Sequence, residues 1–276
     1  MTLVLVFLGF GYMRGWLRLR STSPPAIGAL RAAGFLLALV LIWIAAASPS
    51  AWADWPLLTA HMIQHLLLMS LVPPLIWLAE PLRVVLYALP SPLAESVVLP
   101  IVRSRPIPRL GRLLGHPFVC WVAATAALVA WHVPALLMLS MQSNAWHAIE
   151  HASFLAGGLL FWWPVVQPWP TSSTEPRWSI VLYLFLATLP CDALSGFLVF
   201  SERIAYPMYS SAHRHATLSA LDDQQLAGAL MWTAVTIIYL VAAVIVATRS
   251  LSRSSLLVEV PSALDVVCDL QSGLVP

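Results

Sequence analysis

The chain has 276 residues, of which 60% are apolar and 9% are charged, and its formal net charge is +2. A soluble domain of this size does not carry so much apolar surface, so the composition excludes a soluble globular protein and predicts an all-α, polytopic membrane helix bundle. The small net charge gives no sign of a nucleic-acid partner, and three cysteines without a CxxC pair argue against a disulfide framework or a thiolate metal cluster.

Apolar segments long enough to cross a membrane recur along the whole chain. About 20 helical residues span the hydrocarbon core of a bilayer. We therefore expect about seven transmembrane helices, near residues 1–13, 28–48, 57–79, 117–139, 146–166, 178–200 and 226–248. The first is short because Arg14 ends its apolar run. Residues 249–276 mix serine with scattered apolar residues, so a mostly disordered cytoplasmic tail is expected there.

The arginines predict the orientation of these helices. All 14 basic residues are arginine. If the N-terminus lies outside, every arginine except Arg203 and Arg214 falls on the cytoplasmic side. Because cytoplasmic loops of membrane proteins are enriched in basic residues, we expect an outside N-terminus and a cytoplasmic C-terminus.

The third expected span carries an unusual polar stripe. In "HMIQHLLLMS" (61–70), His61, His65 and Met69 are spaced four residues apart, which places them on one helix face. Pro73 and Pro74 follow and predict a kink.

The next two spans add polar residues at a similar depth, in their outer third. "WHVP" contains His132, and "WHAIEH" places His147, Glu150 and His151 at positions i, i+3 and i+4. Polar side chains within spans are costly, usually face the bundle interior and mark functional sites. The set therefore predicts a binding site, with hydrogen bonding between helices as the purely structural alternative.

The ligand types leave three chemistries open. Imidazole suits zinc, copper and iron, and nearby thioether sulfur favours Cu(I). "HAIEH" also matches the H-x-x-E-H pattern of some zinc hydrolases, although the motif is short and an enzyme is not expected. Histidines on facing helices can also bind haem axially. Copper, zinc and haem are therefore all candidates from the residues alone.

Several motifs together resemble the integral-membrane cytochrome c oxidase assembly factor CtaG family, which is linked to caa(3)-type oxidases. The matching stretches are "HMIQHLLLMSLVPPLIWLAEPLR" (61–83), "WHVPALL" (131–137), "WHAIEHASFLAGGLLFWWPVV" (146–166), "YPMY" (206–209) and "DDQQLAGALMW" (222–232). The resemblance covers residues 10–248. It implies a seven-span protein that helps to build a haem–copper oxidase, with an oxidase subunit and the lipid bilayer as partners. The copper of such an oxidase lies toward the outer side of the membrane, at the depth of the expected histidines. We therefore expect copper as the metal, with zinc or haem as alternatives, and an extracytoplasmic copper donor as a further partner.

The resemblance also indicates functional residues. Together with Met69 from the polar stripe, the expected metal-site residues are His61, His65, His132, His147, Glu150, His151, Gln225 and Met231. One departure is "LPCDALSG" (189–196), which puts Cys191 and Asp192 where the family favours small apolar residues. Cys191 is a candidate extra soft ligand, and Asp192 is a candidate partner for a histidine or for water.

Overall fold

The computed structural model describes residues 1–22, 28–46, 58–88, 114–167, 177–209 and 218–258. Within these ranges the chain is helical and contains no strand. The helices are α1 (Thr2–Thr22), α2 (Ala29–Ala46), α4 (Leu58–Leu66), the π-helix η1 (Leu67–Leu71), α5 (Val72–Leu78), α6 (Pro81–Ala88), α10 (Pro117–Trp131), α11 (Pro134–Gln142), α12 (Asn144–Val166), α13 (Arg177–Phe200), the 3₁₀ turn η3 (Pro207–Tyr209) and α14 (Ala220–Val258).

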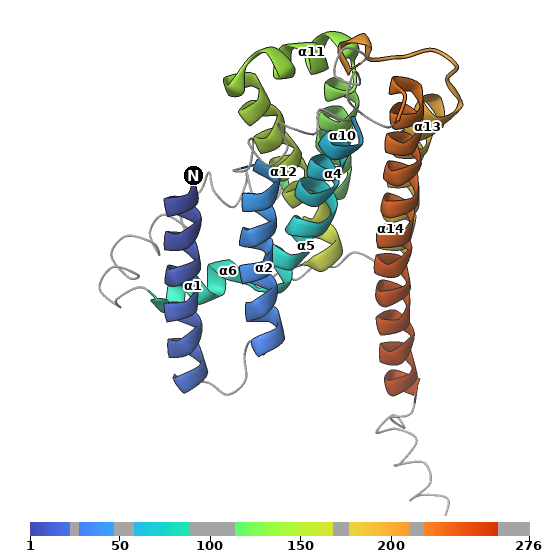
Figure 1. Ribbon diagram of the computed structural model, residues 1–276. Coiled ribbons are helices and arrows are strands. Elements are labelled where there is room, and N and C mark those ends of the chain that lie inside the picture. The colour runs from blue at the N-terminus through green and yellow to red at the C-terminus, as the bar shows by residue number, and fades with distance from the viewer. Residues whose placement is uncertain (23–27, 47–57, 89–113, 168–176, 210–217, 259–276) are drawn as a thin grey trace, which may run out of the picture.

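The predicted membrane bundle is confirmed. Among the described residues, six helical segments are long and apolar enough to cross a membrane, and α10 with α11 makes a seventh if the bent pair is one span. Figure 1 shows these segments running roughly side by side, with α1, α2 and α6 at one side of the bundle and α13 and α14 at the other. Which end faces outside remains a prediction.

Two helices extend beyond their expected ends. Helix α1 continues past Arg14 to Thr22 rather than ending near residue 13. Arginine is a good helix former, and the second half of α1 buries Tyr12, Trp16 and Leu19 in a core shared with α2 and α6. Helix α14 likewise continues to Val258, so residues 249–258 are helical rather than disordered. The prediction for residues 259–276 lies outside the described part of the chain.

The expected span 57–79 is one broken helix, and its break has a clear cause. Pro73 has no N–H to donate to the carbonyl of Met69. The backbone responds with the π-helix η1, in which the N–H of Val72 bonds to the carbonyl of Leu67. The indole Nε1 of Trp162 on α12 then donates to the Met69 oxygen at 3.2 Å. The hydrogen-bond pattern of the helix therefore changes just before the prolines, and a neighbouring helix satisfies the carbonyl that Pro73 leaves free.

The expected span 117–139 is not continuous. Helix α10 ends at Trp131, and α11 turns away by 75°. Pro134 disfavours a helical conformation at the preceding residue, and Val133 accordingly has φ −68° and ψ 124°. Figure 1 shows α11 crossing the end of the bundle. The bend places His132 at the corner between the two helices.

Small residues let the central helices approach closely. A β-carbon at Gly158 on α12 would lie 2.7 Å from the carbonyl oxygen of Met69 and 2.9 Å from its Cα. A β-carbon at Gly228 on α14 would lie 2.9 Å from Cβ of Leu198 on α13. Close packing at small residues is typical of membrane helices. The larger core therefore gathers α4, α10, α12, α13 and α14 around a common centre.

Candidate metal centre

Three parts of the chain bring the predicted histidines together near the end of the bundle that α11 crosses. His61 and His65 come from α4, His132 from the α10–α11 corner, and His147 and His151 from the first turns of α12. The ring centroids of His61 and His147 lie 5.7 Å apart. The ring centroid of His65 lies 6.3 Å from that of His132 and 5.9 Å from that of His151. These five rings and Glu150 are called the histidine cluster below.

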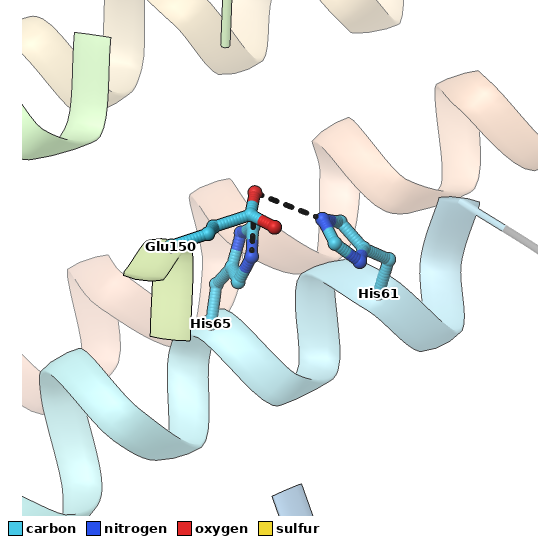
Figure 2. A group of neighbouring side chains, drawn as sticks. All are labelled: His61, His65 and Glu150. Atoms are coloured by element: carbon cyan, nitrogen blue, oxygen red, sulfur yellow. Dashed lines mark hydrogen bonds and ion pairs between the residues drawn. The ribbon is translucent and has the colours of Figure 1, made fainter. Parts of the chain in front are cut away.

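Glu150 joins α12 to α4 at the middle of this cluster. Its side chain is fully buried, and its Oε1 lies 3.3 Å from Nε2 of His61 and 3.3 Å from Nε2 of His65 (Figure 2). A buried carboxylate is costly unless charge or hydrogen bonds compensate it. The two imidazoles of α4 provide part of that compensation, and a bound cation would provide more.

The spacing of the donor atoms suits small metal ions. His61, His65 and Glu150 form one group in which all ligand atoms lie within 4.8 Å of one another, and His147, Glu150 and His151 form a second. Ligands of a tetrahedral ion with bonds of about 2.0–2.1 Å are about 3.3 Å apart. Modest side-chain rotations would close either group around an ion. Glu150 belongs to both groups.

Several buried polar atoms of the cluster lack a hydrogen-bond partner among the described residues. They are both ring nitrogens of His65, Nε2 of His132, Nε2 of His147, Nε2 of His151 and Oε2 of Glu150. The Nε2 atom of His65 and the Oε1 atom of Glu150 lie 3.3 Å apart but do not have hydrogen-bond geometry. Buried polar groups in proteins are nearly always paired, so a group of exceptions requires an explanation.

The backbone fixes one ring in a form suited to binding. Nδ1 of His132 donates to the carbonyl of Leu128 at 2.7 Å, so the proton is on Nδ1 and the lone pair is on Nε2. The hydroxyl of Tyr206 donates to the His132 carbonyl at 2.9 Å and holds the segment after α13 against the corner. Phe154, fully buried on α12, stacks on His65 with centroids 4.0 Å apart.

The five histidines of the cluster differ in how far they are exposed. His61, His65, His132 and His151 are each 5–6% exposed, whereas His147 is half-buried. His147 therefore lies closest to the surface among the five rings. An ion that reached the cluster from the surface would meet this ring first.

One residue that the sequence analysis did not identify positions α4. Asp223, fully buried on α14, accepts hydrogen bonds from the backbone N–H groups of Leu58 at 2.7 Å and Thr59 at 3.2 Å, and from the Thr59 hydroxyl at 2.6 Å. The first N–H groups of a helix have no partner within the helix, so an acidic cap stabilises this end. The only sequence signal was a pair of aspartates before an apolar run.

The neighbouring Gln224 forms hydrogen bonds that hold the segment after α13 in place. Its Oε1 accepts from the N–H of Ala205 at 2.7 Å, and its Nε2 donates to the carbonyls of Leu198 and Arg203 at 3.4 and 3.2 Å. The predicted residue Gln225 is half-buried one position later and does not line the cavity beside the cluster.

The other predicted residues divide into two groups. Met69, Met231 and Cys191 line a cavity that His65 and His132 also line. Asp192 is not paired with a histidine: its buried Oδ1 has no hydrogen-bond partner among the residues that the structure describes.

Comparisons with known proteins agree with the sequence motifs. The family described as cytochrome c oxidase caa3 assembly factor matches residues 10–253. Uncharacterized proteins of Mycobacterium bovis and Mycobacterium tuberculosis are each 25% identical to the chain over 238 residues, and one of Mycobacterium leprae is 25% identical over 248 residues. These matches cover 83% of the chain but 35% of each relative, so the chain spans about a third of their length. No solved structure matches the chain.

Proposed function

The chain belongs to the cytochrome c oxidase caa3 assembly factor family, and from this premise we propose that it handles copper for the copper centre of the oxidase through the histidine cluster. The observation that carries the proposal is the convergence of five imidazoles and one buried carboxylate from three parts of the chain, with several nitrogens left unpaired. Copper is here the cargo of the protein.

The donor set favours copper among the metals that imidazole binds. Thioether sulfur adds preference for Cu(I), and Met69 and Met231 lie in the cavity beside His65. The carboxylate of Glu150 would offset part of the charge of the ion. Because the cluster offers more donors than one ion needs, an ion can exchange one ligand at a time during transfer.

The position of the cluster suits delivery at the membrane surface. The arginine distribution predicts that the end of the bundle beside α11 faces outside. An ion from an extracytoplasmic donor would meet the half-buried His147 first and then the buried rings of His61, His65 and His151. Release to an oxidase subunit would follow the same route in reverse.

Two alternatives fit the geometry less well. In a zinc hydrolase with the H-x-x-E-H pattern, the glutamate acts as a base on metal-bound water. Here Glu150 is fully buried and contacts the α4 histidines, which favours a ligand or orienting role. A haem would need far more room than the adjacent cavity, whose volume is about 40 Å³.

The proposal is tested in a strain that lacks the gene. We expect lower oxidase activity, loss of the copper-centre signal, normal haem content and partial recovery in medium with added copper. The wild-type gene should restore the signal, as should His116→Ala, which changes a histidine at the start of α10 outside the cluster. A gene carrying His61→Ala, His65→Ala and His151→Ala should not. A normal copper signal with the triple variant, or loss of haem in the deletion strain, would contradict the proposal.

A further inference from the structure

A second feature with metal-binding character lies beside the histidine cluster. It is a cavity of about 40 Å³ between α4, η1, α10, α12, α13 and α14. This is room for one or a few small species, since a single water needs about 10–15 Å³ by this measure. Sulfur and imidazole are prominent in its otherwise largely apolar lining: Met62, Met69, Cys191 and Met231, together with His65 and His132. This set is called the sulfur cavity.

The sulfur cavity continues from the histidine cluster into the bundle. His65 and His132 belong to both, whereas His61, His147 and His151 belong to the cluster alone. Along α4 and η1 the lining then passes from His65 to Met69 and Ser70. Along α12 it passes to Phe154 and Phe161, beyond the last histidine of that helix. On both helices the cavity residues follow the histidines in the sequence and so lie farther from the end of the bundle that α11 crosses. The cavity therefore extends the cluster toward the interior of the bundle.

The two histidines that belong to both the cluster and the cavity have ring nitrogens without a hydrogen-bond partner. Both nitrogens of His65 and Nε2 of His132 are buried and lack a hydrogen-bond partner among the described residues. The Nδ1 atom of His132 is already committed to the Leu128 carbonyl, which leaves Nε2 as the nitrogen that can bind an ion. These unpaired nitrogens on the cavity wall are independent of the sulfur atoms and also indicate a cation.

Ordinary core packing accounts less well for this arrangement. Methionine commonly fills irregular gaps in cores. Here Met62, Met69, Met231 and Cys191 are each at most 9% exposed, come from four helical segments and surround a space rather than fill it. Thioether sulfur favours soft cations such as Cu(I), whereas Zn²⁺ is bound in proteins by cysteine, histidine and carboxylate side chains rather than by methionine.

We propose that the sulfur cavity is a second metal site, specific for a soft monovalent cation, Cu(I) or its surrogate Ag(I). The inference rests on the proposed function in that copper reaches the cavity through the histidine cluster. His65 and His132 would exchange the ion between the two sites. Only ligands change in this step, so copper remains Cu(I) and no electron donor or acceptor is needed.

The test is X-ray absorption spectroscopy at the copper edge of the full-length protein, purified in detergent and loaded with Cu(I) without oxygen. We expect both nitrogen and sulfur neighbours of copper in the wild type. In a variant with Met62→Leu, Met69→Leu and Met231→Leu, the sulfur neighbours should fall to the contribution of Cys191 alone. The nitrogen neighbours should be kept, and about half of the bound copper should be lost. Met-to-Leu changes conserve volume, so the fold should tolerate them. The matched control is Met138→Leu, at a 45% exposed position on α11.

Each outcome separates this inference from the proposed function. Copper bound by nitrogen alone in the wild type would overturn the sulfur site and leave copper handling by the histidine cluster intact. The same holds if sulfur neighbours persist in the triple variant at the wild-type level. A wild-type protein that binds neither Cu(I) nor Ag(I) would overturn both proposals. If the triple variant cannot be purified, Met231→Leu alone should still lower the sulfur contribution, and an unchanged contribution would contradict the inference.

Discussion

The carboxylate of Asp223 accepts a hydrogen bond from the backbone N–H of Leu58 at 2.7 Å, across 165 positions of sequence. Leu58 is the first residue of α4, and His61 and His65 lie in its next turns. Helix α14, the last helix that the structure describes, therefore fixes the start of the helix that supplies two rings of the cluster. This cap couples the packing of α14 to the geometry of the candidate metal centre.

Replacement of this cap should weaken both the fold and the site. Asp223→Ala leaves the buried N–H groups of Leu58 and Thr59 without their acceptor, and we expect a loss of about 1–3 kcal/mol in stability. Thermal unfolding in detergent, followed by tryptophan fluorescence, should show a lower melting temperature. Asp222→Ala is the matched control, because Asp222 bonds to Ser219 on the exposed side of the same helix start. Equal melting temperatures for the two variants would argue against the cap.

The contact between α12 and η1 should not tolerate a larger residue. A β-carbon at Gly158 would meet backbone atoms of Met69 at 2.7 and 2.9 Å, and backbone cannot move aside as a side chain can. We expect Gly158→Ala to destabilise the protein by about 1–3 kcal/mol through overpacking. Gly196→Ala should have little effect, because nothing lies within 4 Å of a β-carbon there. A tolerated Gly158→Ala would show that the two helices do not approach this closely.

The hydrogen bond from Trp162 to Met69 should stabilise the break in the third span. Trp162→Phe keeps an aromatic ring but leaves the Met69 carbonyl unpaired in a buried position, at a cost of about 1–3 kcal/mol. Thermal unfolding measures the effect, with Trp178→Phe as the control, since Trp178 is 68% exposed. Identical shifts in the two variants would mean that the indole hydrogen bond contributes nothing.

Glu150 should matter through its charge. Glu150→Gln preserves the shape of the side chain but removes the negative charge that lies 3.3 Å from two imidazoles. We expect copper affinity to fall by about 10–100-fold, the range typical for partners that orient or tune metal ligands. Competition with a Cu(I) chelator measures this change. The control is Glu202→Gln, on the exposed segment after α13. An affinity equal to that of the control would assign Glu150 a structural role only.

Local spacing predicted most of the candidate site. The interval of four residues between His61 and His65, and the i, i+3, i+4 pattern of His147, Glu150 and His151, place each set on one helix face wherever that helix packs. Hydropathy predicted the number of crossing segments and the arginines suggested how they alternate. These signals depend on positions within one turn or one span, which is why the sequence alone could provide them.

The features that the sequence could not provide depend on distant contacts. The cap from Asp223 to α4 and the hydrogen bond from Trp162 to Met69 join different helices. The spacing of residues along the sequence gives no sign of either contact. The lengths of α1 and α14 were underestimated because a charged residue ends an apolar run without ending a helix. The 75° bend between α10 and α11 depends on the extended conformation of Val133, and the continuous span predicted over 117–139 did not include it.

The central claim is that the histidine cluster holds copper, and metal analysis of the purified full-length protein tests it most directly. Inductively coupled plasma mass spectrometry would compare the wild type, the His116→Ala control and the combined His61→Ala, His65→Ala and His151→Ala variant, each loaded with Cu(I) and washed in detergent. We predict that copper is retained by the first two proteins and lost from the third. Equal copper in all three, or none in the wild type, would contradict the account.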